Sequence, residues 1–382
     1  MSGDEKPKNK RRRVIRIAGS AITLAIMIYI AIALISGRGL SLSRLTGVFS
    51  KSEPLEYADE YHFDVGRDRI FTKLGRSLAA VGTLGIQVLD AGGEETLRDP
   101  FRMTNPAICE IGGRAIVFDI GGTTIRVISE TDAIVPLEAN GAIIAASINK
   151  NGWFCVCAQE SGGFKGTVDV YNDKGSPVYK VRLESGYVLS AAVSPDNKSL
   201  AILNLADDGS RITVYNLSSE TPERVFDMPG GLIIDIRYLA GDDLLVVSTD
   251  SLLLLDKNGV AVELYSYYGS LLSSYSIDGG FIALHLLEYG VGFSGWLVTL
   301  GVDGKILGEL STDREIISIS ADNGILAVLR SDGLALLDSG LGELLPLNTP
   351  GLAVGAAKAL VLDSESVLAA GDHSALVIRV KK

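Results

Sequence analysis

Residues 188–217 read VLSAAVSPDNKSLAILNLADDGSRITVYNL, and this stretch sets the expectation for the fold. Short apolar runs lie at Val188–Val193, Leu200–Leu205 and Ile212–Leu217, with turns at Pro195-Asp196-Asn197 and Asp207-Asp208-Gly209 between them. A fourth run follows at Arg224–Met228. Short apolar runs separated by Asp, Asn, Gly and Pro are typical of antiparallel strands joined by tight turns. The stretch therefore predicts one four-stranded antiparallel unit.

The same unit recurs along the chain with a period of about 40 residues, which is typical of the blades of a β-propeller. The next copy predicts strands at Ile233–Tyr238, Leu244–Thr249, Leu252–Leu255 and Val260–Tyr265. Strands that open a unit are expected near Ile70, Ala107, Ile143, Val188, Ile233, Leu272, Ile316 and Val354. No segment after residue 61 keeps a helical period over three turns, so we expect an all-β fold.

The last unit indicates how the ring closes. It offers runs at Val354–Ala359, Ser366–Ala370 and Ala375–Val380 but no fourth strand. Tyr61–Val65 precedes the first unit and can supply that strand, which would pair the two ends of the domain and remove an open sheet edge. We therefore predict eight four-stranded blades, with seven blades as the alternative.

The N-terminal region predicts a membrane anchor. Residues 1–16 are rich in Lys and Arg, and residues 17–36 carry no charge. As a helix, a run of that length can cross a hydrocarbon core of about 30 Å, and the basic flank favours a cytoplasmic N-terminus. A cleaved signal peptide is the alternative, with Ala31-Ile32-Ala33 as a cleavage site inside the apolar run. We expect a single-pass protein of the cell membrane whose C-terminal domain is extracytoplasmic.

Charge and composition divide the remainder of the chain. Residues 37–60 have the Gly, Ser and basic content of a linker, and residues 61–382 form the predicted propeller. The whole chain has a net charge of −11 and residues 1–36 contribute +5, so residues 37–382 carry −16. An acidic domain repels nucleic acid, and nucleic acid is therefore not an expected partner.

Two motifs resemble those of known propellers. Ser194-Pro195-Asp196-Asn197-Lys198-Ser199-Leu200-Ala201 resembles the S-P-D-x-K-x-L-A turn of WD40-like and TolB-type propellers. The Leu-Asp-x-x-Gly segments that begin at Leu89 and Leu255 resemble quinoprotein-like repeats. Overall the chain resembles a domain-of-unknown-function family of membrane-anchored propeller proteins of Gram-positive bacteria. No WD dipeptide occurs and no regular Trp follows these turns, so the resemblance implies the fold and carries over no active site.

The residues that most often carry chemistry form no recognisable constellation in the sequence. The chain has three cysteines, Cys109, Cys155 and Cys157; the last two share a strand-like apolar run and are interpreted as buried hydrophobes, with a redox or metal-binding pair as the alternative. The three histidines, His62, His285 and His373, fall at unrelated positions of the repeat. Asp119-Ile120-Gly121-Gly122-Thr123 resembles a phosphate-binding turn but is interpreted as a hairpin turn. We predict no catalytic, metal-binding or cofactor-binding residue, and no cofactor.

One cluster of aromatic residues is a candidate binding patch. It comprises Tyr265, Tyr267, Tyr268, Tyr275, Phe293 and Trp296. Aromatic side chains at a surface bind sugars or peptides, and the alternative is packing between blades. Three functions stay open: a binding or scaffold module for envelope proteins or cell-wall components, which we favour; an exported hydrolase or lyase acting on glycan or peptide; and a ligand sensor.

Overall fold

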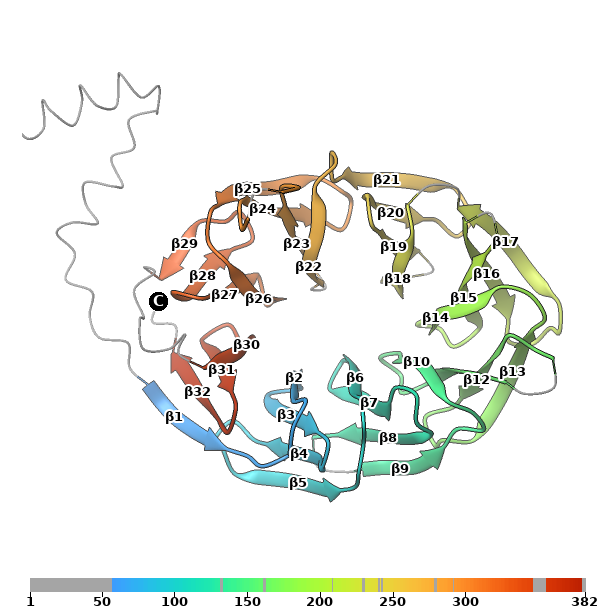
Figure 1. Ribbon diagram of the computed structural model, residues 1–382, viewed down its shortest axis with the longest axis horizontal. Helices are drawn as coiled ribbons and strands as arrows, with labels where there is room; N and C mark the ends of the chain where they lie inside the picture. The colour runs from blue at the N-terminus through green and yellow to red at the C-terminus, as the bar shows by residue number, and fades with distance from the viewer. Residues whose placement is uncertain are drawn as a thin grey trace, which may run out of the picture. The chain divides into compact units, whose positions relative to one another are not determined.

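The computed structural model describes residues 57–379 except 131–132, 161–162, 208, 229–230, 240, 242, 278–279, 291 and 346–354. All described residues belong to one compact unit, Leu55–Lys382. In that part of the chain, 32 strands form eight four-stranded antiparallel sheets arranged as a ring (Figure 1). The predicted propeller of eight blades is confirmed.

Each of the first seven blades is a meander whose first strand lies innermost in the ring (Figure 1). Blade 1 contains β2 (Ile70–Leu74), β3 (Ser77–Gly82), β4 (Gly85–Leu89) and β5 (Glu95–Pro100). Blade 2 contains β6 (Pro106–Ile111), β7 (Arg114–Asp119), β8 (Thr124–Ser129) and β9 (Ala133–Glu138). Blade 3 contains β10 (Ile143–Ile148), β11 (Phe154–Ala158), β12 (Gly166–Tyr171) and β13 (Pro177–Leu183). Blade 4 contains β14 (Tyr187–Val193), β15 (Ser199–Ala206), β16 (Gly209–Asn216) and β17 (Pro222–Met228).

The second half of the ring repeats this order. Blade 5 contains β18 (Ile233–Tyr238), β19 (Leu244–Ser248), β20 (Ser251–Leu255) and β21 (Ala261–Ser266). Blade 6 contains β22 (Leu271–Ile277), β23 (Phe281–Leu287), β24 (Gly295–Gly301) and β25 (Ile306–Thr312). Blade 7 contains β26 (Ile316–Asp322), β27 (Ile325–Arg330), β28 (Gly333–Asp338) and β29 (Glu343–Leu345). Blade 8 contains β30 (Ala356–Asp363), β31 (Ser366–Gly371), β32 (Ser374–Arg379) and β1 (Tyr57–His62).

The hydrophobic core is divided among the contacts between neighbouring blades. Alternate residues of one strand enter different cores, because successive side chains of a strand point to opposite faces. In β11, Phe154 and Val156 pack toward blade 2, whereas Cys155 and Cys157 pack toward blade 4. The middle strands are therefore buried on both faces, which explains their uninterrupted apolar sequences. The interpretation of Cys155 and Cys157 as buried hydrophobes is confirmed, and both are free thiols.

The third and fourth strands of several blades are joined by a turn in which one side chain accepts two backbone hydrogen bonds. Asp90 Oδ1 accepts from the amides of Gly92 at 2.8 Å and Glu94 at 3.0 Å. The same arrangement recurs at Asn172, Asp256 and Asp338. The repeated Asp or Asn before Gly in the sequence therefore reports a side-chain-stabilised turn.

The turn of residues 194–199 also fastens two blades together. Ser194 Oγ accepts from the amide of Ser199 at 2.9 Å, and Asn197 has a positive φ of 62°. From blade 3, Asn149 Nδ2 donates to the Ser194 carbonyl at 2.9 Å and to Asn197 Oδ1 at 2.7 Å. Asn149 Oδ1 accepts from the amides of Asn151 and Trp153. This buried amide thus links the turns of blades 3 and 4.

The ring closes between the two ends of the domain. Strand β1 pairs with β32 in an antiparallel ladder that includes Tyr61 opposite Ala375 and His62 opposite Ser374. The prediction that a segment before the first unit supplies the fourth strand of the eighth blade is confirmed. Its bounds differ, since the strand spans Tyr57–His62 and not Tyr61–Val65, and it begins within the predicted linker 37–60.

The predicted anchor at residues 17–36 lies outside the described residues, as does the basic tail at residues 1–16. Among the residues the structure describes, no helix has the length and apolar character needed to span a membrane.

Candidate functional site

A cavity of about 210 Å³ lies between the outer strands of blades 5 and 6, and aromatic side chains form much of its wall. Its residues come from β21 and the turn after it, and from β23, β24 and β25. The lining consists of Tyr265, Tyr267, Tyr268, Ser270, Leu286, Trp296, Val298 and Glu309. We call this the aromatic cavity.

The turn after β21 sets the directions of two of these tyrosines. The Tyr267 amide donates to the Asp250 carbonyl at 2.9 Å, and the Ser270 amide donates to the Tyr267 carbonyl at 2.9 Å. Between them Tyr268 has a φ of 51°, which is uncommon for a bulky residue. Tyr267 is 1% exposed and Tyr268 is 85% exposed, so the turn buries one ring and presents the next to solvent.

The cavity is polar at one side. The Tyr265 hydroxyl lies 3.4 Å from Glu309 Oε1, beyond the usual O–H···O range of about 2.5–3.0 Å. Burial, together with the Glu309 carboxylate, raises the pKa of Tyr265 to about 12. The Tyr267 hydroxyl is buried and has no hydrogen-bond partner among the described residues. Two hydrogen-bonding groups at the wall are therefore weakly paired or unpaired.

The structure brings together four of the six residues predicted for the aromatic patch. Tyr265, Tyr267, Tyr268 and Trp296 all line the aromatic cavity, and the Tyr265 and Tyr268 rings meet edge to face with centroids 6.1 Å apart. Phe293 does not line it; it is 52% exposed on the segment between β23 and β24. Tyr275 belongs to β22, the innermost strand of blade 6, and faces a different set of residues.

Tyr275 joins a charged pair near the axis of the ring. Its hydroxyl donates to Asp235 Oδ2 at 2.6 Å, and Arg237 Nε donates to the same oxygen at 2.8 Å. Burial raises the pKa of Tyr275, and the Asp235 carboxylate raises it further. Removal from water lowers the pKa of Arg237, but Asp235 more than offsets this effect and the net direction is upward. Tyr275 is thus a positioning partner of Asp235 and not part of the aromatic cavity.

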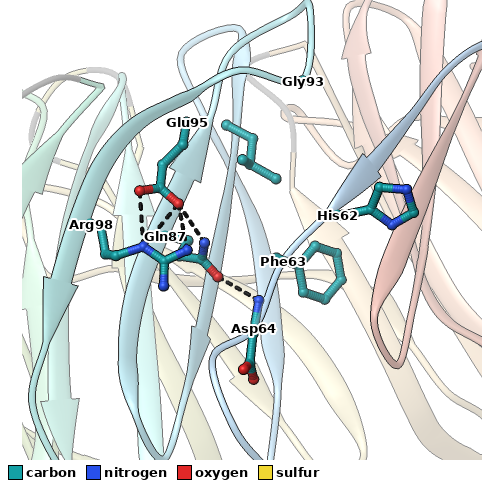
Figure 2. Close-up of a pocket in the computed structure, with 8 residues that line it drawn as sticks. His62, Phe63, Asp64, Gln87, Gly93, Glu95 and Arg98 are labelled. Atoms are coloured by element: carbon teal, nitrogen blue, oxygen red, sulfur yellow. Dashed lines mark hydrogen bonds and ion pairs between the residues drawn. The ribbon is translucent and has the colours of Figure 1, made fainter.

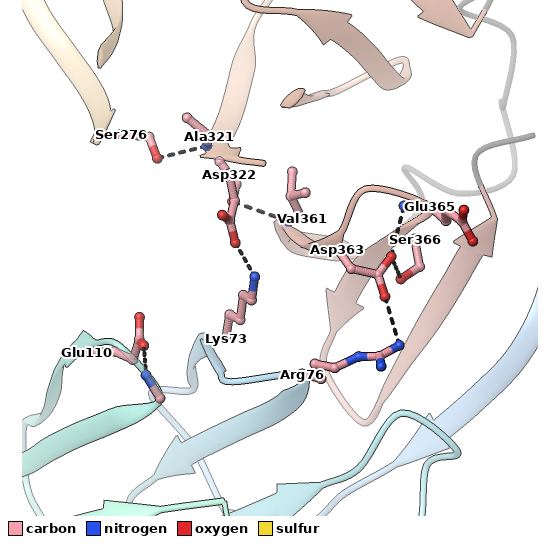
Figure 3. Close-up of polar contacts among 12 residues, drawn as sticks. Lys73, Arg76, Glu110, Ser276, Ala321, Asp322, Val361, Asp363, Glu365 and Ser366 are labelled. Atoms are coloured by element: carbon pink, nitrogen blue, oxygen red, sulfur yellow. Dashed lines mark hydrogen bonds and ion pairs between the residues drawn. The ribbon is translucent and has the colours of Figure 1, made fainter. Parts of the chain in front are cut away.

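Other charged residues of the innermost strands meet near the same axis. Lys73 of β2 forms an ion pair with Asp322 of β26, and Figure 3 shows the two side chains pointing toward each other. Glu110 of β6 accepts a hydrogen bond from the Gly113 amide at 2.9 Å, and burial raises the pKa of this carboxyl. Blades 1, 2 and 7 therefore each contribute a charged group.

Serines of the innermost strands link three pairs of neighbouring blades: 3 with 4, 6 with 7, and 7 with 8. Ser147 Oγ donates to the Ala191 carbonyl at 2.7 Å, and Ser318 Oγ accepts from the Ala359 amide at 2.9 Å. Ser276 Oγ accepts from the Ala321 amide at 2.9 Å, as Figure 3 shows. These hydroxyls form hydrogen bonds with the backbone of the neighbouring blade and so stabilise the contact between the two blades.

The strongest candidate nucleophile and base are both unsuited to catalysis in this arrangement. Burial raises the pKa of the Cys109 thiol, which keeps the thiol protonated near neutral pH. His285 is 2% exposed, and both of its ring nitrogens lack a hydrogen-bond partner among the described residues. Burial lowers the pKa of His285, so the ring is neutral. In the described part of the chain, no group of three or more His, Cys, Asp or Glu side chains could hold a metal ion.

The Asp119–Thr123 segment is a hairpin turn between β7 and β8, as predicted. Asp119 Oδ1 accepts from the amides of Thr104 at 2.9 Å and Asn105 at 2.6 Å. The carboxylate thereby holds the connection from blade 1, and no helix follows the turn as a phosphate-binding motif would require.

A second cavity of about 340 Å³ lies between blades 8 and 1, and polar side chains that line it form hydrogen bonds and an ion pair with one another (Figure 2). Gln87 Oε1 accepts from the Asp64 amide at 2.6 Å, and Gln87 Nε2 donates to Glu95 Oε2 at 2.6 Å. Arg98 pairs with the same Glu95 carboxylate at 2.7 Å. The Arg98 hydrogen bond lowers the pKa of Glu95. This network stabilises the closing junction of the ring.

The two cavities occupy matching places in the repeat. Arg98 lies opposite Gln87 across β4 and β5, and Glu309 lies opposite Val298 across β24 and β25. Gln87 and Val298 each stand two residues before the last apolar residue of their strand. The closing junction thus has a cation where the aromatic cavity has a carboxylate.

Sequence reasoning missed Glu309 and the charged residues of the innermost strands. Glu309 is 41 residues from Tyr268, and nothing local marks it. A signal for the others was present, since Asp235 and Arg237 interrupt the apolar run of the predicted strand Ile233–Tyr238.

A family model described as "Family of unknown function (DUF5711)" matches residues 51–332. The chain belongs to this family. The DUF5711 match includes every residue of the aromatic cavity. No curated protein matches the chain.

The solved structures similar to this DUF5711 protein include two that are described as WD40 domains. The C-terminal WD40 domain of Sif2 is 14% identical, with a TM-score of 0.56 over 87% of this chain and 100% of that one. The WD40 domain of SCAP from fission yeast is 13% identical, with a TM-score of 0.56 over 86% and 98%. AztD from Citrobacter koseri is 11% identical, with a TM-score of 0.50 over 72% and 84%. At these identities the likeness shows the WD40-like propeller fold alone.

Proposed function

We propose that this protein is a membrane-tethered, extracytoplasmic binding module for an envelope protein or a cell-wall component, with the aromatic cavity as its ligand site. The carrying observation is the convergence of Tyr265, Tyr267, Tyr268 and Trp296 on one cavity at the junction of two blades. Tyrosine and tryptophan are enriched where proteins bind partners, because they offer large rigid surfaces at a low cost in conformational entropy.

Two further features support a binding role for this place. Tyr268 and Trp296 are 85% and 41% exposed, so the cavity presents two large aromatic side chains to solvent. Tyr268 also holds a left-handed backbone conformation, and such strained residues cluster at ligand sites. The exposed ring of Tyr268 does not contribute to the hydrophobic core. A contact with a partner would explain why the chain keeps a strained tyrosine at this position.

The arrangement near the axis supports binding over catalysis. Lys73 is paired with Asp322, and Arg237 and Tyr275 are both paired with Asp235. Groups that satisfy one another in this way stabilise the ring, whereas an active site presents groups toward a substrate.

Support for the tether comes from the sequence, where the basic residues 6–16 precede the uncharged residues 17–36. Fractionation of cells that produce the full chain with a C-terminal tag tests this part. We expect the tag in the membrane fraction and accessible to protease added outside spheroplasts. Full-length protein in the cytosol would contradict it.

Cross-linking in intact cells tests the binding role. The wild-type chain should capture an envelope protein or a cell-wall fragment, and a Tyr268→Ala, Trp296→Ala double variant should lose that product. Tyr187→Ala is the matched control, because Tyr187 is also exposed (61%) but lies on blade 4. Equal capture by the double variant would exclude the aromatic cavity as the site, and no captured component from wild type would contradict a binding module.

A further inference from the structure

We propose that the aromatic cavity binds a positively charged alkylammonium group carried by its partner. This inference rests on the proposed function and names the chemistry of the ligand. The first argument is the composition of the wall, which has four aromatic side chains, one carboxylate and no Lys, Arg or His. Aromatic faces attract cations through the ring quadrupole, and tryptophan does so most strongly.

Glu309 is an exposed carboxylate of β25 at the edge of the aromatic cavity, and no ion pair among the described residues includes it. Within the described residues, no basic side chain lies within ion-pair distance of Glu309, and its hydrogen bond with Tyr265 is long at 3.4 Å. A carboxylate beside a cavity wall gains most from a cationic partner that brings its own charge. The carboxylate therefore favours a cationic ligand over a neutral sugar and disfavours an anion.

At the closing junction of the ring, between blades 8 and 1, the chain itself supplies a cation for the carboxylate that lines the cavity. There, Arg98 stands at the position that matches Glu309, and its guanidinium pairs with Glu95 at 2.7 Å. The cavity between blades 8 and 1 thus holds both an acid and its cation. In the aromatic cavity the Glu309 carboxylate is exposed and no basic side chain lines the wall, so this carboxylate is open to a cation that a partner carries.

Size and overall charge define the ligand further. About 210 Å³ is smaller than the roughly 300–1,000 Å³ of typical small-molecule sites. The cavity therefore suits one side-chain-sized group of a larger partner and not a whole cofactor. The net charge of −16 on residues 37–382 also attracts cations toward this part of the chain.

Tryptophan fluorescence of the full chain in detergent tests the proposal. The chain has two tryptophans, and Trp153→Phe leaves Trp296 in the cavity as the only one. We expect n-butylammonium or tetramethylammonium chloride to change its emission saturably, and sodium chloride at the same ionic strength or N-acetylglucosamine to leave it unchanged. If Trp153→Phe does not fold, saturation-transfer NMR of the same probes with the unaltered chain gives the same readout.

Two variants separate a cation site from a generic aromatic surface. Glu309→Gln should weaken ammonium binding about fivefold or more, and Trp296→Leu should weaken it about fivefold to thirtyfold, measured by NMR. Glu263→Gln is the matched control, because Glu263 is an exposed carboxylate of β21 that does not line the cavity. It should bind as wild type does.

Three results would overturn the inference: no saturable response to either ammonium salt, unchanged binding by Glu309→Gln, or binding of N-acetylglucosamine in place of the ammonium probes. The last result would leave the proposed binding module standing with a glycan ligand. If the wild-type chain captures no component by cross-linking in cells, the proposed function is contradicted even when the ammonium probes bind.

Discussion

Removal of the Tyr61 ring from the closing strand should cost the domain a large share of its stability. Tyr61 is 1% exposed in the core between blades 8 and 1, and its hydroxyl donates to the Ala91 carbonyl at 2.7 Å. Truncating a buried aromatic residue to alanine costs about 3–5 kcal/mol, because both the buried area and its packing contacts are lost. The lost hydrogen bond adds about 1 kcal/mol, so Tyr61→Phe should cost about that amount and Tyr61→Ala about 4–6 kcal/mol.

Urea unfolding of the full chain in detergent, followed by tryptophan fluorescence, measures these differences. Trp153 and Trp296 lie in blades 3 and 6, so they report on the ring away from the altered strand. The control is Tyr187→Ala, an exposed tyrosine whose loss should change the free energy of unfolding by less than about 0.5 kcal/mol. A loss below about 1 kcal/mol for Tyr61→Ala would refute the reasoning, because the closing strand would then add little to the stability of the ring.

Three further tests concern a buried histidine, an ion pair and a buried amide. His285 is buried, and burial lowers its pKa, so the folded chain keeps the ring neutral. In the unfolded chain the ring binds a proton as the pH falls below about 6.5, which favours unfolding. The free energy of unfolding of the wild type should therefore fall by up to about 1.4 kcal/mol per pH unit. His285→Leu should remove that drop in unfolding midpoints compared at pH 7 and pH 5, and an unchanged pH dependence would contradict it. Lys73→Met leaves the Asp322 carboxylate without its cation and should lower the free energy of unfolding in urea by about 1–3 kcal/mol. Adding Asp322→Leu should restore part of this loss. A double variant that is less stable than Lys73→Met would argue against the pair. Asn149→Asp keeps the oxygen that accepts two amides but loses the donor to the Ser194 carbonyl, so we expect a loss of about 2 kcal/mol by thermal or urea unfolding, and wild-type stability would exclude this link between blades 3 and 4.

The sequence predicts the blades well because each innermost strand begins a new apolar run. Seven of the eight predicted openings fall within one residue of the observed strands, and the eighth, Val354, lies outside the described residues just before β30. Asp and Asn turns separate these runs, and their side chains bond to the backbone, so the same residues that mark the turns also hold them.

The outermost strands are harder to predict because water covers one side of them. Strand β5 has the sequence ETLRDP, and β1 begins with Tyr57, Ala58, Asp59 and Glu60, so neither shows an apolar pattern. The predicted domain boundary at residue 61 therefore falls four residues after the start of β1. The missing fourth run of the last unit predicts the pairing of β1 with β32, but the residues of β1 itself do not mark where the strand begins and ends.

The aromatic patch was predicted only in part, for a related reason. Neighbours in sequence separate when a blade ends, so Tyr268 stays at the rim of the ring while Tyr275 enters the innermost strand of the next blade. Glu309 lies on β25, the outermost strand of blade 6, and reaches the cavity because it pairs with Val298 of β24. The sequence does not show this strand register.

The pairing of Tyr57 with Ile378 has a consequence for biosynthesis. The first strand of the domain leaves the ribosome more than 300 residues before its partner, so the ring stays open until translation is nearly complete. Contacts this distant along the chain slow folding, and a nascent product that stops before Ser374 keeps unpaired strands at both β1 and β31. Such open strands recruit other chains, which makes premature termination near the C-terminus an aggregation hazard and not merely a loss of one strand.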